Sequence, residues 1–131
     1  TSSLKDEETA YHRAYEPGAR ATTTLRAFME GYLGAPPAIL RERFITARPG
    51  EAYEYSNIGA ALAAWALESA TGADFAAFTA ERVFAPLGMA STSWARASDR
   101  TEAVLYDARN RPVPLYTLAT YPDGGLRTTC D

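Results

Sequence analysis

The chain has 131 residues, of which 47% are hydrophobic, and this is enough for one modest domain with a real core. Its formal net charge of -3 at pH 7 provides no basic surface for nucleic acid, so we expect no nucleic-acid partner. The single cysteine, Cys130, excludes an internal disulfide, and one histidine adds no metal cluster, so we expect no metal and no other cofactor. No segment approaches the roughly 18 apolar residues of a membrane span.

Residues 1–20 carry few apolar side chains. The charged run Lys-Asp-Glu-Glu at 5–8 is interpreted as a solvated stretch, and His12, the only histidine, as a surface or loop residue. Ser2 and Lys5 have the Ser-x-x-Lys spacing in which a lysine takes the proton of a nucleophilic serine. Neighbouring carboxylates favour the charged form of Lys5, and no apolar helical pattern follows Ser2, so we do not expect this pair to be catalytic.

The clearest predicted helix covers residues 22–34, where apolar side chains recur at i, i+3, i+4, i+7 and i+8. The side chains on this face are Leu25, Phe28, Met29, Tyr32 and Leu33. Thr22 or Thr23 is expected to cap the start of the helix. Gly34 and the two prolines at 36–37 are expected to end it.

Residues 49–59 lead from a Pro-Gly turn, through an extended run, into a helix. Asn57 is predicted to be the N-cap of that helix, with Tyr55 just before it. A helix start leaves backbone N–H groups free and favours nearby negative charge, so a tyrosine hydroxyl held there could be pushed toward phenolate and accept a proton. The alternative is structural: a tyrosine packed under the helix start and an asparagine that only caps it.

Two more helices are predicted. Residues 57–70 form an alanine-rich apolar helix that ends at Thr71-Gly72. Asp74 is expected to cap a following helix over about 75–84. We expect the helices to pack around Trp65.

The last third of the chain has a different character. Apolar segments on both sides of a polar loop predict a small β-hairpin near 104–116, whose second arm is kept at an edge by its prolines. The segment 121–126 contains Gly124 and Gly125 and is predicted to be a turn with unusual backbone angles.

Several short stretches, taken together and in this order, resemble the serine beta-lactamase-like family, which holds class C beta-lactamases, DD-peptidases and related esterases. Tyr55-Ser56-Asn57 matches the second motif of that family, Tyr-x-Asn. The other matching stretches are Pro49-Gly50, Glu68-Ser69-Ala70-Thr71-Gly72, Phe84-Ala85-Pro86-Leu87-Gly88-Met89 and Asp123-Gly124-Gly125-Leu126. The start of the chain resembles the family's His-Thr-Ser-Gly turn, with Ser3 in place of the usual glycine. The resemblance covers nearly the whole chain.

The resemblance implies a fold class that is mainly α: the helical domain of the beta-lactamase/transpeptidase-like α+β fold, with little or no central sheet. Residues 1–131 would be a single domain, the helical subdomain of a larger serine hydrolase, and the flanking α/β parts would be absent. The chain would then be an internal fragment of that hydrolase.

The resemblance also implies a mechanism. A nucleophilic serine attacks a carbonyl carbon, and water then hydrolyses the acyl-enzyme. Tyr55 would be the general base and acid partner of the serine, and would need neighbouring cations near neutral pH. Asn57 would hydrogen-bond the substrate's amide side chain or the catalytic lysine. Ser56, Gly124 and Gly125 are expected to line the substrate cleft.

The nucleophile and the third motif of that family, Lys-Thr-Gly or His-x-Gly, are missing from these residues, which hold one lysine and one histidine. The expected partners are therefore a small-molecule acyl substrate and the remainder of the parent hydrolase. An ester, a beta-lactam and a peptide amide all stay open as substrates. The alternative hypothesis is a non-catalytic helical binding module that lacks the nucleophile. The resemblance allows a periplasmic or secreted location, and the residues leave a cytoplasmic one open.

Overall fold

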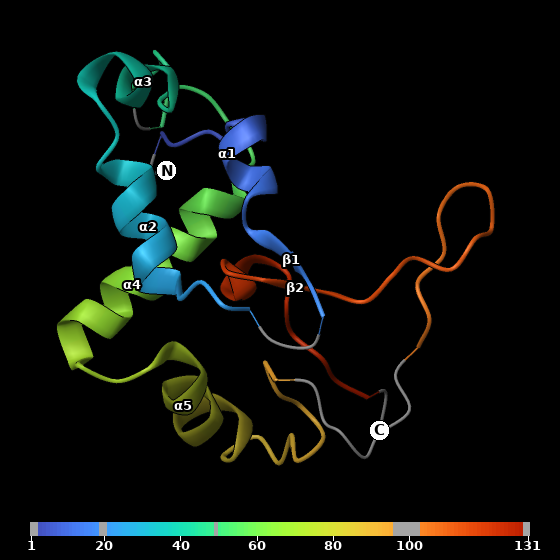
Figure 1. Cartoon of the computed structure of the whole chain (residues 1–131). Coiled ribbons are helices and arrows are strands. Elements are labelled where there is room, and N and C mark those ends of the chain that lie inside the picture. Colours follow the sequence, from blue (N-terminus) through green and yellow to red (C-terminus); the bar gives the residue numbers. More distant parts are fainter. Residues whose placement is uncertain (1–2, 19–20, 49, 96–102, 130–131) are drawn as a thin grey trace.

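The computed structural model describes residues 3–18, 21–48, 50–95 and 103–129 (Figure 1). Its helices are α1 (Glu8–His12), α2 (Leu25–Leu33), α3 (Pro37–Glu42), α4 (Asn57–Thr71) and α5 (Phe75–Thr79). A π-helical turn, η1 (Ala80–Phe84), continues α5, and a 3-10 turn, η2 (Tyr121–Asp123), lies near the end of the chain. The strands are β1 (Tyr15–Pro17) and β2 (Tyr116–Leu118). The predictions on Ser2, Pro49 and Cys130 lie outside the described residues.

The clearest predicted helix is confirmed as α2. Its cap, however, is Thr24, whose Oγ1 accepts a hydrogen bond from the backbone N–H of Ala27 at 3.1 Å. Thr22 and Thr23 are not the cap, because their backbone N–H groups donate to the carboxylate of Glu16 at 2.6 and 2.9 Å. The side chains that α2 buries are Leu25, Met29 and Tyr32.

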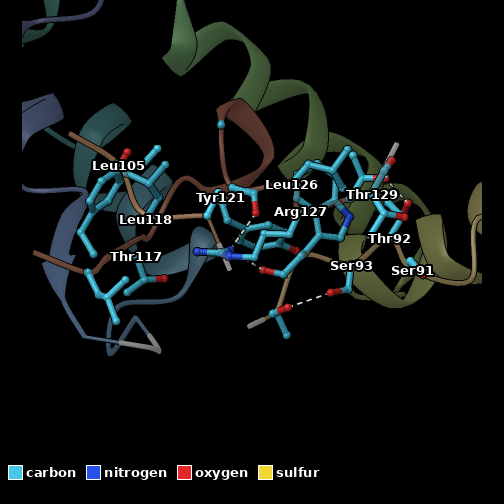
Figure 2. A pocket seen from close by; sticks show the side chains of 18 of the residues that line it. Ser91, Thr92, Ser93, Leu105, Thr117, Leu118, Tyr121, Leu126, Arg127 and Thr129 are labelled. Carbon is cyan, nitrogen blue, oxygen red and sulfur yellow. Dashed lines mark hydrogen bonds between the residues drawn. The ribbon is translucent and has the colours of Figure 1, made fainter. Parts of the chain in front are cut away.

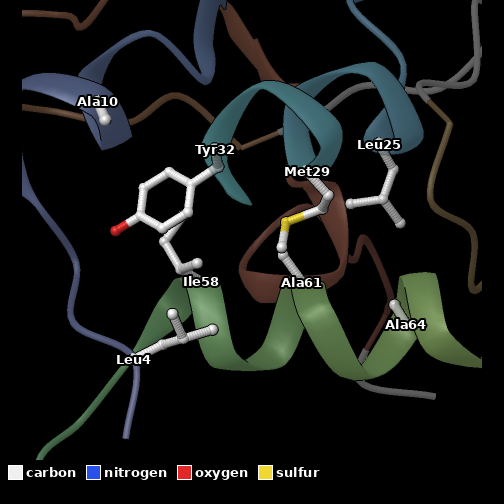
Figure 3. Packing of buried hydrophobic residues seen from close by; sticks show 8 residues of the cluster. All are labelled: Leu4, Ala10, Leu25, Met29, Tyr32, Ile58, Ala61 and Ala64. Carbon is white, nitrogen blue, oxygen red and sulfur yellow. The ribbon is translucent and has the colours of Figure 1, made fainter. Parts of the chain in front are cut away.

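The core lies where α2 crosses α4 (Figure 3). Met29 of α2 and Ile58 of α4 are both fully buried. The facing positions on α4 are Ala61 and Ala64, whose small side chains let the two helices approach closely. Trp65, around which the helices were expected to pack, is only partly buried and lies against this cluster.

Both ends of α4 are fixed by local residues. The predicted cap, Asn57, is the first helical residue, and the N-cap is Ser56, whose Oγ accepts from the N–H of Gly59 at 2.8 Å. Gly72 ends the helix in the left-handed region, at φ 71°, as glycine commonly does. Asp74 caps α5 as predicted, and its carboxylate accepts from Ala77 at 2.9 Å.

The predicted β-hairpin near 104–116 is wrong. In that segment one isolated bridge joins Tyr106 to Pro112, and the loop is held by the side chain of Asp107, which accepts backbone N–H bonds from Arg109 and Arg111 at 2.8 and 2.9 Å. Proline has no N–H, so Pro112 and Pro114 prevent a longer ladder. Figure 1 shows this segment as an extended arm that projects from the helices.

The paired strands join distant parts of the chain. β1 and β2 are antiparallel, with Tyr15 opposite Leu118 and Pro17 opposite Tyr116. The backbone N–H of Ala119 extends the pairing by donating to Ala14 at 2.8 Å. Of the described residues, 41% are in helix and 10% in strand. The predicted fold class, a mainly α helical domain with a β-hairpin near 104–116, is therefore wrong, because the described residues also hold a two-stranded antiparallel sheet that pairs residues 15–17 with residues 116–118.

None of the helices in the described part of the chain is both long and apolar enough to cross a membrane.

Met29→Ala is expected to lower the free energy of unfolding by about 2–5 kcal/mol, because the side chain is 0% exposed and its removal leaves a cavity between α2 and α4. Leu87→Ala is the matched control: that side chain is 68% exposed, and its loss should change stability by less than about 0.5 kcal/mol. Urea denaturation measures both values. Equal effects of the two substitutions would contradict this location of the core.

Candidate active site

Tyr55 and Asn57 lie together at the start of α4. The hydroxyl of Tyr55 donates a hydrogen bond to Oδ1 of Asn57 at 3.0 Å. Tyr55 is 65% exposed, whereas Asn57 is half-buried. The sequence predicted both residues at this junction, and the structure adds that their side chains are in direct contact.

Asp6 is the residue that sequence reasoning missed. Its carboxylate accepts hydrogen bonds from the Nδ2 and backbone N–H of Asn57, at 2.7 and 2.9 Å, and from the backbone N–H of Ile58 at 2.9 Å. The hydroxyl of Ser56 donates a fourth bond, at 3.1 Å. The run 5–8 was expected to be solvated, but Asp6 is half-buried in this network. No local pattern could reveal it, because its partners lie 50 to 52 positions away.

Ser56 uses its hydroxyl within the protein. It donates to Asp6 and accepts from Gly59, so it closes the first turn of α4. Ser56 also lines a small pocket of about 340 Å³, together with Leu4, Ile45 and Glu54.

Gly124 and Gly125 line a different and larger groove, of about 980 Å³ (Figure 2). Its walls come from residues 90–95, 103–105 and 113–118, from Tyr121, and from residues 124–129. The five predicted site residues thus occupy two places: Tyr55, Ser56 and Asn57 at the start of α4, and the two glycines in this groove. Their roles stay predictions.

The groove is lined by aromatic rings, among them those of Trp94 and Tyr121, and by the guanidinium group of Arg127. The ring of Trp94 meets that of Tyr121 edge-on, with 5.5 Å between the centroids. The guanidinium of Arg127 donates to the carbonyl of Gly125 at 3.0 Å, which ties the glycine turn to the groove. Figure 2 shows Arg127 between Tyr121 and Ser93.

Asp123, the last residue of η2, is a buried carboxyl group. Burial raises the pKa of Asp123 from 3.8 to about 6. The nearby hydroxyls of Thr120 and Tyr11 act in the opposite direction and lower the pKa, whereas the charge of Asp6 raises it further. Neither carboxylate oxygen of Asp123 has a hydrogen-bond partner among the described residues. An ionised carboxylate without partners is costly in such a place, and protonation relieves that cost.

A model of the family described as Beta-lactamase matches residues 4–131. The chain belongs to the beta-lactamase family. The resemblance recognised in the sequence is thereby confirmed. A search of curated proteins finds no match.

Solved structures of the beta-lactamase fold resemble this chain. D-amino acid amidase from Ochrobactrum anthropi SV3, complexed with D-phenylalanine, superposes with a TM-score of 0.60 at 22% identity over 98% of this chain. Its complex with L-phenylalanine gives a TM-score of 0.57 at 24% identity, also over 98% of the chain. The octameric penicillin-binding protein homologue from Pyrococcus abyssi gives 0.49 at 25% identity, over 83% of this chain and 29% of its own. The chain spans 39% of the first amidase structure and 36% of the second, and these similarities show the fold alone.

The backbone of Ser3 has a φ angle that is unusual for a residue other than glycine. Ser3 stands where the resemblance has a glycine, and its φ is 58°, in the left-handed region that favours glycine. A serine in this region carries a cost in backbone strain.

Gly125→Ala is expected to destabilise the protein by about 1–3 kcal/mol, because an added Cβ would lie 2.9 Å from the carbonyl oxygen of Tyr121 and 3.0 Å from its Cβ. Gly124→Ala is the matched control. Its Cβ would meet only Leu118 Cδ1, at an ordinary 3.7 Å. Thermal denaturation of the two variants makes the comparison, and an equal loss of stability would contradict the close turn at Gly125.

The buried Asp123 predicts how stability depends on pH. Because its pKa is raised from 3.8 to about 6 in the folded protein, its contribution is fully favourable below about pH 4 and is lost as the pH rises through 6. Asp123→Asn should therefore remove this loss and stabilise the protein at pH 8 by about 1–2 kcal/mol, which is less than the full pKa shift would give because solvent screens part of the charge. Urea denaturation from pH 4 to pH 8 tests this, with the exposed Glu54→Gln as control. An unchanged pH profile in Asp123→Asn would refute the assignment.

Proposed function

We propose that this chain is part of a serine hydrolase of the beta-lactamase family that forms and hydrolyses an acyl-enzyme on an ester, a beta-lactam or a peptide amide. The observation that carries the proposal is the pair of Tyr55 and Asn57, bonded at 3.0 Å at a helix start within a family member. The exposed hydroxyl of Tyr55 supports it, because a proton-transfer group must be reachable by the reacting atoms.

In the proposed reaction the oxygen of a nucleophilic serine bonds to the carbonyl carbon of the substrate and loses its proton. Tyr55, as phenolate, takes that proton and returns it to the leaving group when the acyl bond breaks. Water then attacks the acyl carbon and gives a proton to Tyr55. The bond between the acyl carbon and the serine oxygen breaks, and Tyr55 returns the proton to that oxygen. Asn57 orients the tyrosine and, with its remaining amide hydrogen, is suited to bind the carbonyl oxygen of a substrate side chain.

The nucleophile of this reaction is proposed to lie outside the 131 residues. The sequence holds one lysine, Lys5, and one histidine, His12, which α1 places exposed in its last turn. Neither stands in a family motif, and the chain spans 39% of a similar amidase structure. The remainder of the hydrolase would supply the serine and the cations that Tyr55 needs.

Tyr55→Phe in the full-length hydrolase is expected to lower kcat by about 10²-fold or more, the scale of losing a group that transfers protons. Tyr53→Phe is the matched control, because that tyrosine lies two residues away and is 86% exposed. Steady-state hydrolysis of a panel of esters, beta-lactams and peptide amides measures both variants. Unchanged turnover in Tyr55→Phe would remove Tyr55 from the mechanism.

Labelling separates this function from the alternative, a non-catalytic binding module. A serine-reactive fluorophosphonate should add once to the full-length protein and should leave the 14.2 kDa chain unmodified, as seen by intact mass. A full-length protein that takes no label and hydrolyses none of the panel would favour the binding module.

A further inference from the structure

The carboxylate of Asp6 collects the donors of the first turn of α4. Oδ1 accepts from the hydroxyl of Ser56 and the N–H of Ile58, and Oδ2 accepts from the N–H and the Nδ2 of Asn57, all between 2.7 and 3.1 Å. A helix start has backbone N–H groups without helical partners, and an anion stabilises it. Asp6 meets this need from a segment more than 50 positions away in the sequence.

These bonds decide which way the amide of Asn57 points. An ionised carboxylate can only accept hydrogen bonds, so the end of the amide that faces Asp6 must be the donor, Nδ2. The opposite end, Oδ1, then faces Tyr55 and can only accept. The hydroxyl of Tyr55 donates to it, at 3.0 Å.

The amide in turn orients the hydroxyl of Tyr55. While Tyr55 carries its proton, its O–H bond is directed at Asn57, and the oxygen keeps its lone pairs for donors that approach from solvent, to which the residue is 65% exposed. Reversal of the amide would place an N–H donor against the hydroxyl and change which groups that oxygen can serve. Asp6 therefore orients the amide of Asn57, and that amide orients the hydroxyl of Tyr55.

We propose that Asp6 is a positioning residue of the active site: its carboxylate fixes the amide of Asn57, and through it the direction of the Tyr55 hydroxyl. The inference rests on the proposed function. It assigns to Asp6 a role in turnover beyond accepting the hydrogen bonds at the start of α4.

Asp6→Asn is the sharpest substitution, because it keeps the shape of the side chain and replaces one acceptor oxygen by a donor. The new amide cannot accept all four bonds. If its nitrogen faces Asn57, that side chain gains by reversing, which turns its Nδ2 toward Tyr55. Glu8→Gln is the control: it also removes one negative charge from the same segment, and Glu8 is exposed.

The test is a double-substitution cycle in the full-length hydrolase. Asp6→Asn should lower kcat by about 10- to 100-fold, the scale of a misoriented reacting group, while Glu8→Gln leaves kcat unchanged. In a Tyr55→Phe background, Asp6→Asn should lower kcat no further, because the hydroxyl that it orients is gone. A residue that served only folding would lower kcat equally in both backgrounds, and that result would overturn the proposal.

Two outcomes separate this inference from the proposed function. If Tyr55→Phe leaves kcat unchanged, the proposed function fails, and the inference with it. If Tyr55→Phe lowers kcat but Asp6→Asn does not, the inference alone fails. Should Asp6→Asn not fold, the same cycle is run with Asp6→Glu, which keeps the acceptor oxygens but moves them; a kcat like that of the unsubstituted enzyme would then contradict the positioning role.

Discussion

The start of α4 needs acceptors for its free backbone N–H groups, and much of the structure depends on how that need is met. Ser56 satisfies the N–H of Gly59, and Asp6 satisfies those of Asn57 and Ile58. Because Asp6 belongs to the N-terminal segment, the same bonds fasten that segment to the central helix. The exposed Tyr55 and the amide beside it take their positions from this junction.

Around this junction the core is built mainly from α2 and α4. The alanines of α4 let α2 approach, and Met29 and Ile58 fill the space between the two helices. The sheet of β1 and β2 then holds the last part of the chain against the first. Asp123 is buried close enough to Asp6 that the charge of Asp6 raises the pKa of Asp123, although the two residues are far apart in sequence.

The sequence by itself determined the features that depend on neighbours along the chain. The face of α2 follows from the spacing of its apolar residues, the end of α4 from Gly72, and the start of α5 from Asp74. It also determined the family, since the motif Tyr55-Ser56-Asn57 and the stretches around it keep a recognisable order. Local hydrogen bonds and side-chain periodicity are short-range effects, and short-range effects can be inferred from sequence.

Only the tertiary structure decided which distant groups meet. The segment near 104–116 has the alternation of a hairpin, but its prolines limit local pairing, and the true partner of β2 is β1, about a hundred positions earlier. Asp6 looked like one of several solvated charges, because the four groups that donate to it are all distant in the sequence. Its partners are created by the start of a helix 50 residues later, and a carboxylate finds such donors only when the chain has folded.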